Sequence, residues 1–265
     1  AVPGYDYQNY FVGTITELNI DNTDIVGANM RKGLRMRVLL EDFYGINKGA
    51  KQFSRVDLDV RYYQPLVNNL TFAIRGAGGR YMGVGKKQFM LGGSDGMINR
   101  GNINYNGEGN PLGEIENNPL TGNADILFSR FVTNVRGYGF NTVYGQNYFL
   151  FNAELRLPIA KFFFARSSVG SSFIRHLQVF GFGDMGASWT GDNPFSRNNT
   201  FSKFSYNSVP FYGTAITYAT PVLSSYGFGF RSFLLGYYVK LDVAYPVRDF
   251  VKLPTAYVFS IGHDF

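Results

Sequence analysis

Nine segments of the chain alternate apolar and polar residues with the two-residue period of a β-strand. The clearest covers residues 55–62, where Val56, Leu58, Val60 and Tyr62 share one face and charged residues share the other. The remaining segments are 10–20, 34–41, 70–81, 149–157, 177–188, 226–234, 237–245 and 256–265. The pattern predicts an all-β, antiparallel fold of nine strands.

One face of these strands is almost wholly apolar, while the opposite face carries charges of both signs. This polarity is typical of a transmembrane β-barrel, in which lipid lies outside and polar groups lie inside. A soluble β-sandwich also buries one face of each strand, so it remains an alternative. The residues expected to face lipid are Val56, Leu58, Val60, Val239, Leu241 and Val243.

The last predicted strand ends on an aromatic residue. One face carries Tyr257, Phe259, Ile261, His263 and Phe265. A transmembrane strand that runs to a terminal aromatic has this pattern, and His263 would lie at the level of the lipid headgroups.

Connections between the segments alternate in length. Tight turns are expected at Asn68-Asn69 and at Leu235-Gly236, and long loops over 82–147 and 191–222. Short turns at one rim and long loops at the other are typical of outer-membrane barrels. Two connections on the expected short side, 22–32 and 158–173, are longer than usual.

Composition narrows the possible functions. Aromatic residues make up 17% of the chain and charged residues only 17%, and no stretch is apolar enough for a membrane helix. The net charge of +6 is modest, and Lys and Arg are not clustered, so nucleic-acid binding is not expected. There is no cysteine, and His176 and His263 are the only histidines, so thiolate and histidine-rich metal sites are excluded, and we expect no cofactor or metal.

Three short runs occur in a specific order. Val135-Arg136-Gly137-Tyr138 comes first, Asn152-Ala153-Glu154-Leu155-Arg156-Leu157-Pro158 follows, and Phe180-Gly181-Phe182-Gly183-Asp184-Met185-Gly186 comes third. With the C-terminal strand, this order resembles the C-terminal part of the bacterial surface antigen superfamily of BamA/TamA-like outer-membrane barrels. A subgroup that carries a periplasmic propeller is further suggested by Leu91-Gly92-Gly93, residues 166–182 and Ala187-Ser188-Trp189-Thr190-Gly191.

The resemblance implies a sixteen-strand barrel, of which this chain would supply strands eight to sixteen. It further implies that the sequence is a piece of a longer protein, although a small barrel closed by nine strands is a competing interpretation. In the family, the motif loop around Val135–Tyr138 folds back into the barrel lumen. Carried over to this sequence, Arg136 would contact Asp184, with Glu154 close by, as a latch inside the lumen.

Alternation supports an inward Glu154, but Asp184 shares its face with Phe180 and Phe182, which makes its direction less certain. Gly137 would allow a tight turn beside the barrel wall, and Tyr138 would pack against that wall. Five glycines on neighbouring strands leave space for the inserted loop or simply allow curvature. They are Gly181, Gly183, Gly186, Gly227 and Gly229.

The resemblance implies a non-enzymatic, integral protein of the bacterial outer membrane. It would assist insertion, assembly or translocation of proteins through a weak lateral seam beside the C-terminal strand. Expected partners are outer-membrane lipid, client outer-membrane or secreted proteins, and periplasmic proteins or lipoproteins. The alternatives are a barrel that anchors or exports a fused periplasmic domain, and a passive porin or structural barrel.

Overall fold

The computed structural model describes residues 9–27, 30–47, 49–67, 70–98, 128–159, 172–196, 203–208, 211–216, 220–234 and 236–262. Strands dominate these residues, and the one helix among them is the short α3 (Ser172–Arg175). Within these ranges, no helix has the length and apolar character needed to cross a membrane. The prediction of an all-β, antiparallel fold is confirmed.

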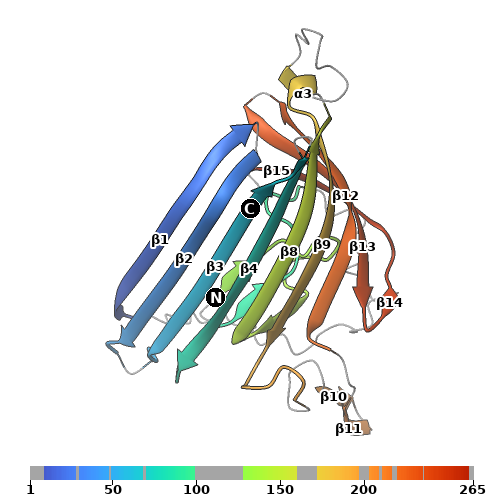
Figure 1. The fold of residues 1–265 in the computed structure, drawn as a ribbon. Helices are drawn as coiled ribbons and strands as arrows, with labels where there is room; N and C mark the ends of the chain where they lie inside the picture. The colour runs from blue at the N-terminus through green and yellow to red at the C-terminus, as the bar shows by residue number, and fades with distance from the viewer. Residues whose placement is uncertain are drawn as a thin grey trace, which may run out of the picture.

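All nine predicted segments form strands of one curved, ten-stranded antiparallel sheet (Figure 1). The order is β1-β2-β3-β4-β8-β9-β12-β13, and both β14 and β15 pair with β13. The strands are β1 (Phe11–Gly27), β2 (Met30–Gly45), β3 (Phe53–Pro65), β4 (Thr71–Gly83), β8 (Asn147–Pro158), β9 (Gln178–Trp189), β12 (Val222–Leu234), β13 (Tyr237–Arg248), β14 (Val251–Lys252) and β15 (Ala256–Ile261).

The expectation of a long connection over 22–32 is wrong. β1 continues to Gly27 and β2 begins at Met30, with Asn22 opposite Leu34 and Asp24 opposite Lys32. Side chains on the two strands support this extension, because Arg31 donates a hydrogen bond to the Thr23 hydroxyl at 3.0 Å. The polar residues that suggested a loop therefore belong to a hairpin.

The sheet has an apolar outer face and a polar inner face. In β8, Phe149, Phe151 and Leu155 are exposed on the outer face, whereas Asn152 and Glu154 are buried on the inner face. Exposed apolar side chains continue across the outer face of the sheet from β1 to β15. They include Leu18, Leu34, Leu40, Val56, Leu58, Phe72, Phe228, Phe230, Leu241 and Tyr257.

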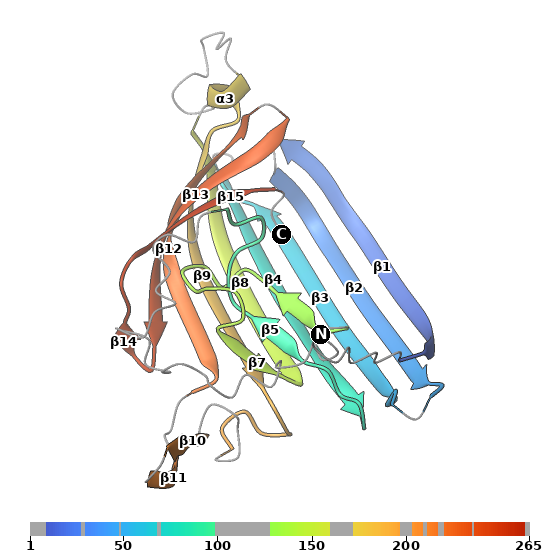
Figure 2. The ribbon, with the colours of Figure 1, turned by 180° about the vertical axis from the view of Figure 1, so that it is seen from behind.

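A segment between β4 and β8, here called the insert (residues 84–146), packs against the inner face with its described residues, 84–98 and 128–146 (Figure 2). Its strands are β5 (Phe89–Leu91), β6 (Arg130–Val132) and β7 (Val143–Gly145); β5 pairs parallel with β6 and antiparallel with β7. Buried apolar residues join the insert to the wall. They include Phe89, Leu91, Val135, Val143, Tyr81, Tyr148 and Leu150.

The other long connection, 191–222, contains a separate two-stranded hairpin of β10 (Lys203–Ser208) and β11 (Phe211–Ile216). The main sheet is open, since no ladder among the described residues joins β1 to β15. Over the described ranges β1 pairs with β2 alone, and its other long edge faces away from the sheet (Figure 1).

Candidate functional site

The motif loop, Val135–Tyr138, lies on the inner face of the sheet. Two residues with left-handed backbone conformations flank Arg136: Asn134 has φ 78° and Gly137 has φ 87°. The loop is held from behind because the backbone N–H groups of Asn134 and Val135 both donate to the carbonyl of Gly93, at 2.9 and 3.1 Å. These turns direct the Arg136 side chain at the wall.

Arg136 and Asp184 form a two-pronged ion pair. Nε of Arg136 donates to Oδ2 of Asp184 at 2.7 Å, and Nη2 donates to Oδ1 at 2.8 Å. The backbone N–H of Arg136 also donates to Oδ2, at 3.2 Å. This fork is the geometry in which an arginine binds a carboxylate most strongly. The structure thus brings together the first two residues expected from the sequence.

Glu154, the third expected residue, accepts hydrogen bonds from three arginines. Arg136 Nη1 donates to its Oε1 at 2.6 Å, while Arg156 and Arg231 reach Oε2 at 2.8 and 3.3 Å. Each of these four side chains is at least nine-tenths buried. Glu154 is therefore compensated as a buried carboxylate, and together with Asp184 it offsets two of the three arginine charges.

Sequence reasoning missed five contributors to the site. Asn152 donates to Oδ1 of Asp184 at 2.8 Å, and Arg156 of β8 and Arg231 of β12 both donate to Glu154. Phe180 and Phe182, which made the direction of Asp184 doubtful, lie beneath the guanidinium: its carbon is 3.7 Å from the Phe182 ring centroid and 5.7 Å from that of Phe180. A cation over aromatic rings is attracted by their π-electrons. The sequence signal for this contact was that Phe180, Phe182 and Asp184 occupy alternate positions and therefore share one face of the strand.

Gly137 and Tyr138 fix the far side of the loop. A Cβ at Gly137 would come within 3.0 Å of the Ala244 side chain, so β13 packs closely there. The Tyr138 hydroxyl lies 3.0 Å from the Ser224 carbonyl and 2.9 Å from the Val247 carbonyl, either of which accepts its hydrogen bond. The tyrosine therefore connects the loop to both β12 and β13.

The five glycines have different surroundings. A Cβ on Gly186 would lie 2.9 Å from Val135 and 3.0 Å from Leu91, both in the insert. On β12, a Cβ at Gly227 would lie 2.8 Å from the Phe182 ring, and a Cβ at Gly229 would lie 2.5 Å from the Phe180 ring. Gly186 therefore makes room for the loop, whereas the β12 pair makes room for the rings under Arg136. Gly181 and Gly183 have no side chain within 4 Å of such a Cβ.

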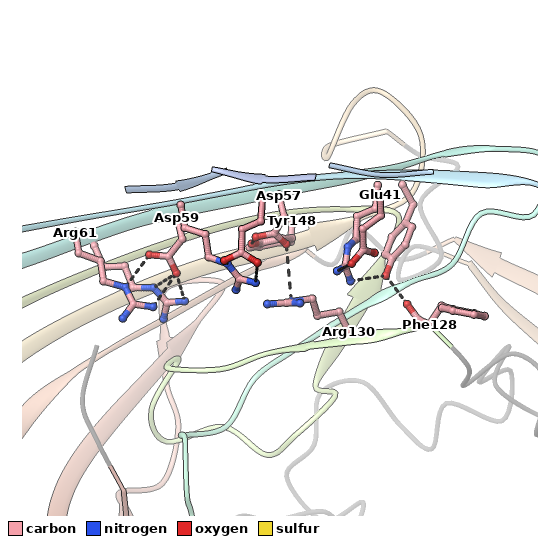
Figure 3. A network of polar contacts seen from close by, with 12 residues as sticks. Glu41, Asp57, Asp59, Arg61, Phe128, Arg130 and Tyr148 are labelled. Atoms are coloured by element: carbon pink, nitrogen blue, oxygen red, sulfur yellow. Dashed lines mark hydrogen bonds and ion pairs between the residues drawn. The ribbon is translucent and has the colours of Figure 1, made fainter. Parts of the chain in front are cut away.

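A second line of polar contacts runs along the inner face of β2, β3, β4 and β8 (Figure 3). Tyr81 donates to the carbonyl of Phe128, where the insert returns to the wall. Asp57 accepts from the Tyr148 hydroxyl at 3.1 Å and lies 3.9 Å from Arg130 of β6. The insert is thus held at two places, the Arg136 site and this line.

Charge and burial set the protonation states of Arg136, Tyr138 and Tyr144. Burial alone would lower the pKa of Arg136, but the carboxylates of Asp184 and Glu154 outweigh that effect and raise it, so the guanidinium stays charged. Burial raises the pKa of Tyr138 to about 12 and that of Tyr144 to about 12. Both phenols are therefore neutral hydrogen-bond donors at physiological pH.

The described charged side chains of the inner face form ion pairs with one another and are not arranged as metal ligands. Over the described part of the chain, no group of three or more His, Asp or Glu side chains is arranged to hold a metal ion. The carboxylates of the site accept hydrogen bonds from arginines and from Asn152. Such an arrangement can hold the loop firmly against the wall.

The C-terminal strand keeps its expected faces as far as it is described. Tyr257 is half exposed on the outer face, while Val258 and Ser260 are buried on the inner face. His263 and Phe265, expected on the outer face, lie outside the described residues, as do Asn68-Asn69 and most of 158–173.

No protein-family model matches the chain, and a search of curated proteins found no match either. Membership of the bacterial surface antigen superfamily therefore remains a prediction that rests on the three motifs and their order along the chain.

Proposed function

We propose that this chain forms part of the wall of a transmembrane β-barrel in the bacterial outer membrane, and that the barrel is a BamA/TamA-like protein that inserts or translocates other proteins. The observation that carries the proposal is the reversed polarity of the sheet. Its outer face is covered by exposed apolar side chains, and its inner face holds buried ion pairs.

A lipid environment accounts for that polarity. Soluble proteins rarely expose continuous apolar patches larger than a few hundred Å², because contact with water is unfavourable. Here the apolar outer face extends across every long strand of the sheet, and only strands closed into a barrel can cross a lipid bilayer without unsatisfied backbone groups. Buried carboxylates and guanidinium groups on the inner face fit a narrow polar lumen.

The insert favours the BamA/TamA-like assignment over a passive porin. A porin needs an open channel along the barrel axis. In this chain the insert occupies the inner face and is attached to β8 and β9 by the Arg136 ion pairs, to β12 and β13 by Tyr138, and to β4 by Tyr81. The motif loop that the family resemblance implies is the segment that makes the first two attachments.

In this proposal the protein makes and breaks no covalent bond. A client strand would pair with the edge of a seam strand by backbone hydrogen bonds, a form of β-augmentation, and β15 would border the seam. Lipid, client outer-membrane or secreted proteins, and periplasmic proteins or lipoproteins would be its partners.

These 265 residues contain no cysteine, so single introduced cysteines allow a direct test of the membrane-facing surface. Single cysteines at Leu58 and Leu241 would carry nitroxide spin labels in the natural protein in vesicles. We expect these labels to collide with oxygen dissolved in the lipid and to be shielded from a water-soluble nickel complex. A label at Val84, exposed and outside the strands, is the matched control with the opposite preference. Nickel access equal at all three positions would refute the membrane assignment.

Insertion activity requires a separate measurement. Vesicles containing the protein should fold a urea-denatured outer-membrane protein faster than empty vesicles do. Lipid-facing labels without any acceleration would leave a barrel that anchors or exports a fused domain. Rapid passage of small sugars through the vesicle membrane would instead identify a porin.

A further inference from the structure

The outer edge of β15 is occupied by a short segment of the insert, Gly96–Ile98, here called the cap. The N–H of Ile98 donates to the carbonyl of Phe259 at 2.9 Å, and the N–H of Ile261 donates to the carbonyl of Gly96 at 3.0 Å. Between these bonds, Met97 and Ser260 form an antiparallel bridge. The cap therefore sits where the next strand of the sheet would pair.

The direction of the backbone groups explains this position. β15 bonds to β13 through even-numbered residues, as the bond from Gly262 N–H to the Tyr238 carbonyl at 2.9 Å shows. In an antiparallel strand the alternate residues direct their N–H and C=O groups to the opposite edge. Phe259 and Ile261 are two such residues, and both bond to the cap.

The cap is also connected to the Arg136 site by continuous hydrogen bonds. Asn152 donates to Asp184 at 2.8 Å and also donates to the backbone carbonyl of Asn134. The side-chain oxygen of Asn134 in turn accepts from the N–H of Asp95 at 3.3 Å, one residue before the cap. Asn134 thus lies between the ion pairs and β15.

We propose that Gly96–Ile98 is a displaceable cap that regulates access to the edge of β15, and that Asn134 couples the cap to the Arg136 site. The occupant of the uncapped edge, an extended antiparallel segment of a client polypeptide, rests on the proposed function. The cap spans three residues, whereas β15 has six, so a strand of full length forms more backbone bonds than the cap. The segment that fits has apolar residues at alternate positions, because these continue the outer face of Tyr257, Phe259 and Ile261. The capping contact itself is independent of whether the chain lies in a membrane.

Trapping by a disulfide tests the capping contact. Met97 and Ser260 form a non-hydrogen-bonded pair, whose Cα atoms lie about 4.5 Å apart, within the range that a disulfide bridges. In the natural protein in detergent solution, Met97→Cys with Ser260→Cys should cross-link on mild oxidation. The matched pair Met97→Cys with Ala256→Cys should not. Equal cross-linking of both pairs would refute the assigned register.

Asn134 variants test the coupling. Asn134 has a positive φ, which glycine tolerates, so Asn134→Gly removes the side chain without backbone strain. Loss of a hydrogen bond of about 1 kcal/mol should slow cross-linking of the 97/260 pair about five-fold. Asn134→Asp keeps an acceptor oxygen and should cross-link at nearly the original rate. No difference between the two variants would refute the coupling.

A peptide tests the docking edge. The probe is a fluorescent synthetic peptide of residues 237–245, the segment that pairs antiparallel with the other edge of β15. It should bind the reduced 97/260 protein, bind less than a tenth as well once the cap is locked by oxidation, and fail to bind as a scrambled sequence. Gly96→Val should bind more tightly, because its Cβ would lie 1.9 Å from the Ile261 carbonyl oxygen and expel the cap. If that variant does not fold, the comparison of peptide binding to the oxidised and reduced forms of the 97/260 protein is the test. Equal binding to both forms, or none to either, would refute the docking edge.

Discussion

Arg136 donates hydrogen bonds to two carboxylates while its guanidinium lies over two phenyl rings. Because these groups are buried, the loss of one partner leaves the other uncompensated. We expect Arg136→Ala or Asp184→Ala to lower the free energy of unfolding by about 3–5 kcal/mol. The double variant should cost much less than the sum, with a coupling of about 1–3 kcal/mol. Denaturant titration in vesicles measures all three.

The exposed pair of Arg80 and Asp192 is the matched control for this double-mutant cycle. Its side chains are 55% and 87% exposed, at a distance of 2.7 Å. Solvent screens such a pair, so Arg80→Ala should change stability by less than about 1 kcal/mol. Additive effects of the two Arg136-site substitutions would show that the contact does not hold the loop.

The ionisation of Tyr138 should make the free energy of unfolding fall at high pH. Its pKa is raised from 10.0 to about 12 in the folded protein. Below pH 10 the phenol is protonated in both states and adds no pH dependence. Between about pH 10 and 12 only the unfolded state ionises, so the free energy of unfolding falls, by about 2–3 kcal/mol in all. Unfolding titrations across this range should show a slope that is shallower in Tyr138→Phe, with the remainder coming from Tyr144, whose pKa is also raised to about 12.

Among the elements, β13 offers a contrast between mid-strand and strand end. Leu241 is 45% exposed on the outer face, and Tyr237 is 65% exposed at the first residue of the same strand. If the strand crosses a bilayer, Leu241→Arg places a charge near the hydrocarbon centre and should cost about 2–4 kcal/mol. Tyr237→Arg, near the interface, should cost about 0–1 kcal/mol. Wild-type folding yield and stability for Leu241→Arg would contradict the assignment of faces.

The long strands could be predicted because alternation over about ten residues is a strong local signal. β8 has the predicted faces throughout, with Glu154 and Arg156 inward and Phe149, Phe151 and Leu155 outward. The extension of β1 and β2 over 22–32 could not be predicted, since Asn22, Asp24 and Gly33 individually favour turns. Pairing between the two strands outweighs those preferences.

The candidate site was predictable in part. The family motif and alternation indicated Arg136, Asp184 and Glu154. Arg231 and the short strands of the insert depend on contacts between residues far apart in the sequence, such as Arg231 with Glu154. No local pattern reports which distant strand lies alongside, so these features required the three-dimensional structure.

For the whole molecule, the open sheet sets the requirement for folding. β1 is a 17-residue edge strand, and no ladder among the described residues joins it to β15. Unpaired edges are not stable in lipid and template aggregation in water. Residues 1–265 expressed alone in detergent should therefore aggregate or stay partly unfolded. A monodisperse product whose migration in gel electrophoresis changes on heating would show that these strands close into a barrel by themselves.

β4 and β8 are neighbours in the sheet although residues 84–146 separate them. Closing a flexible loop of that length costs about 4 kcal/mol of chain entropy before any bond between the strands forms. The packing of β5, β6 and β7 on the wall can offset that cost only if the insert is already compact when β4 meets β8. The insert then governs the rate of folding, and weakening its attachment by Asp184→Ala should slow refolding more than it speeds unfolding. Packing of the insert on the inner face would thus be the folding step that first brings β4 and β8, and with them the two halves of the sheet, into contact.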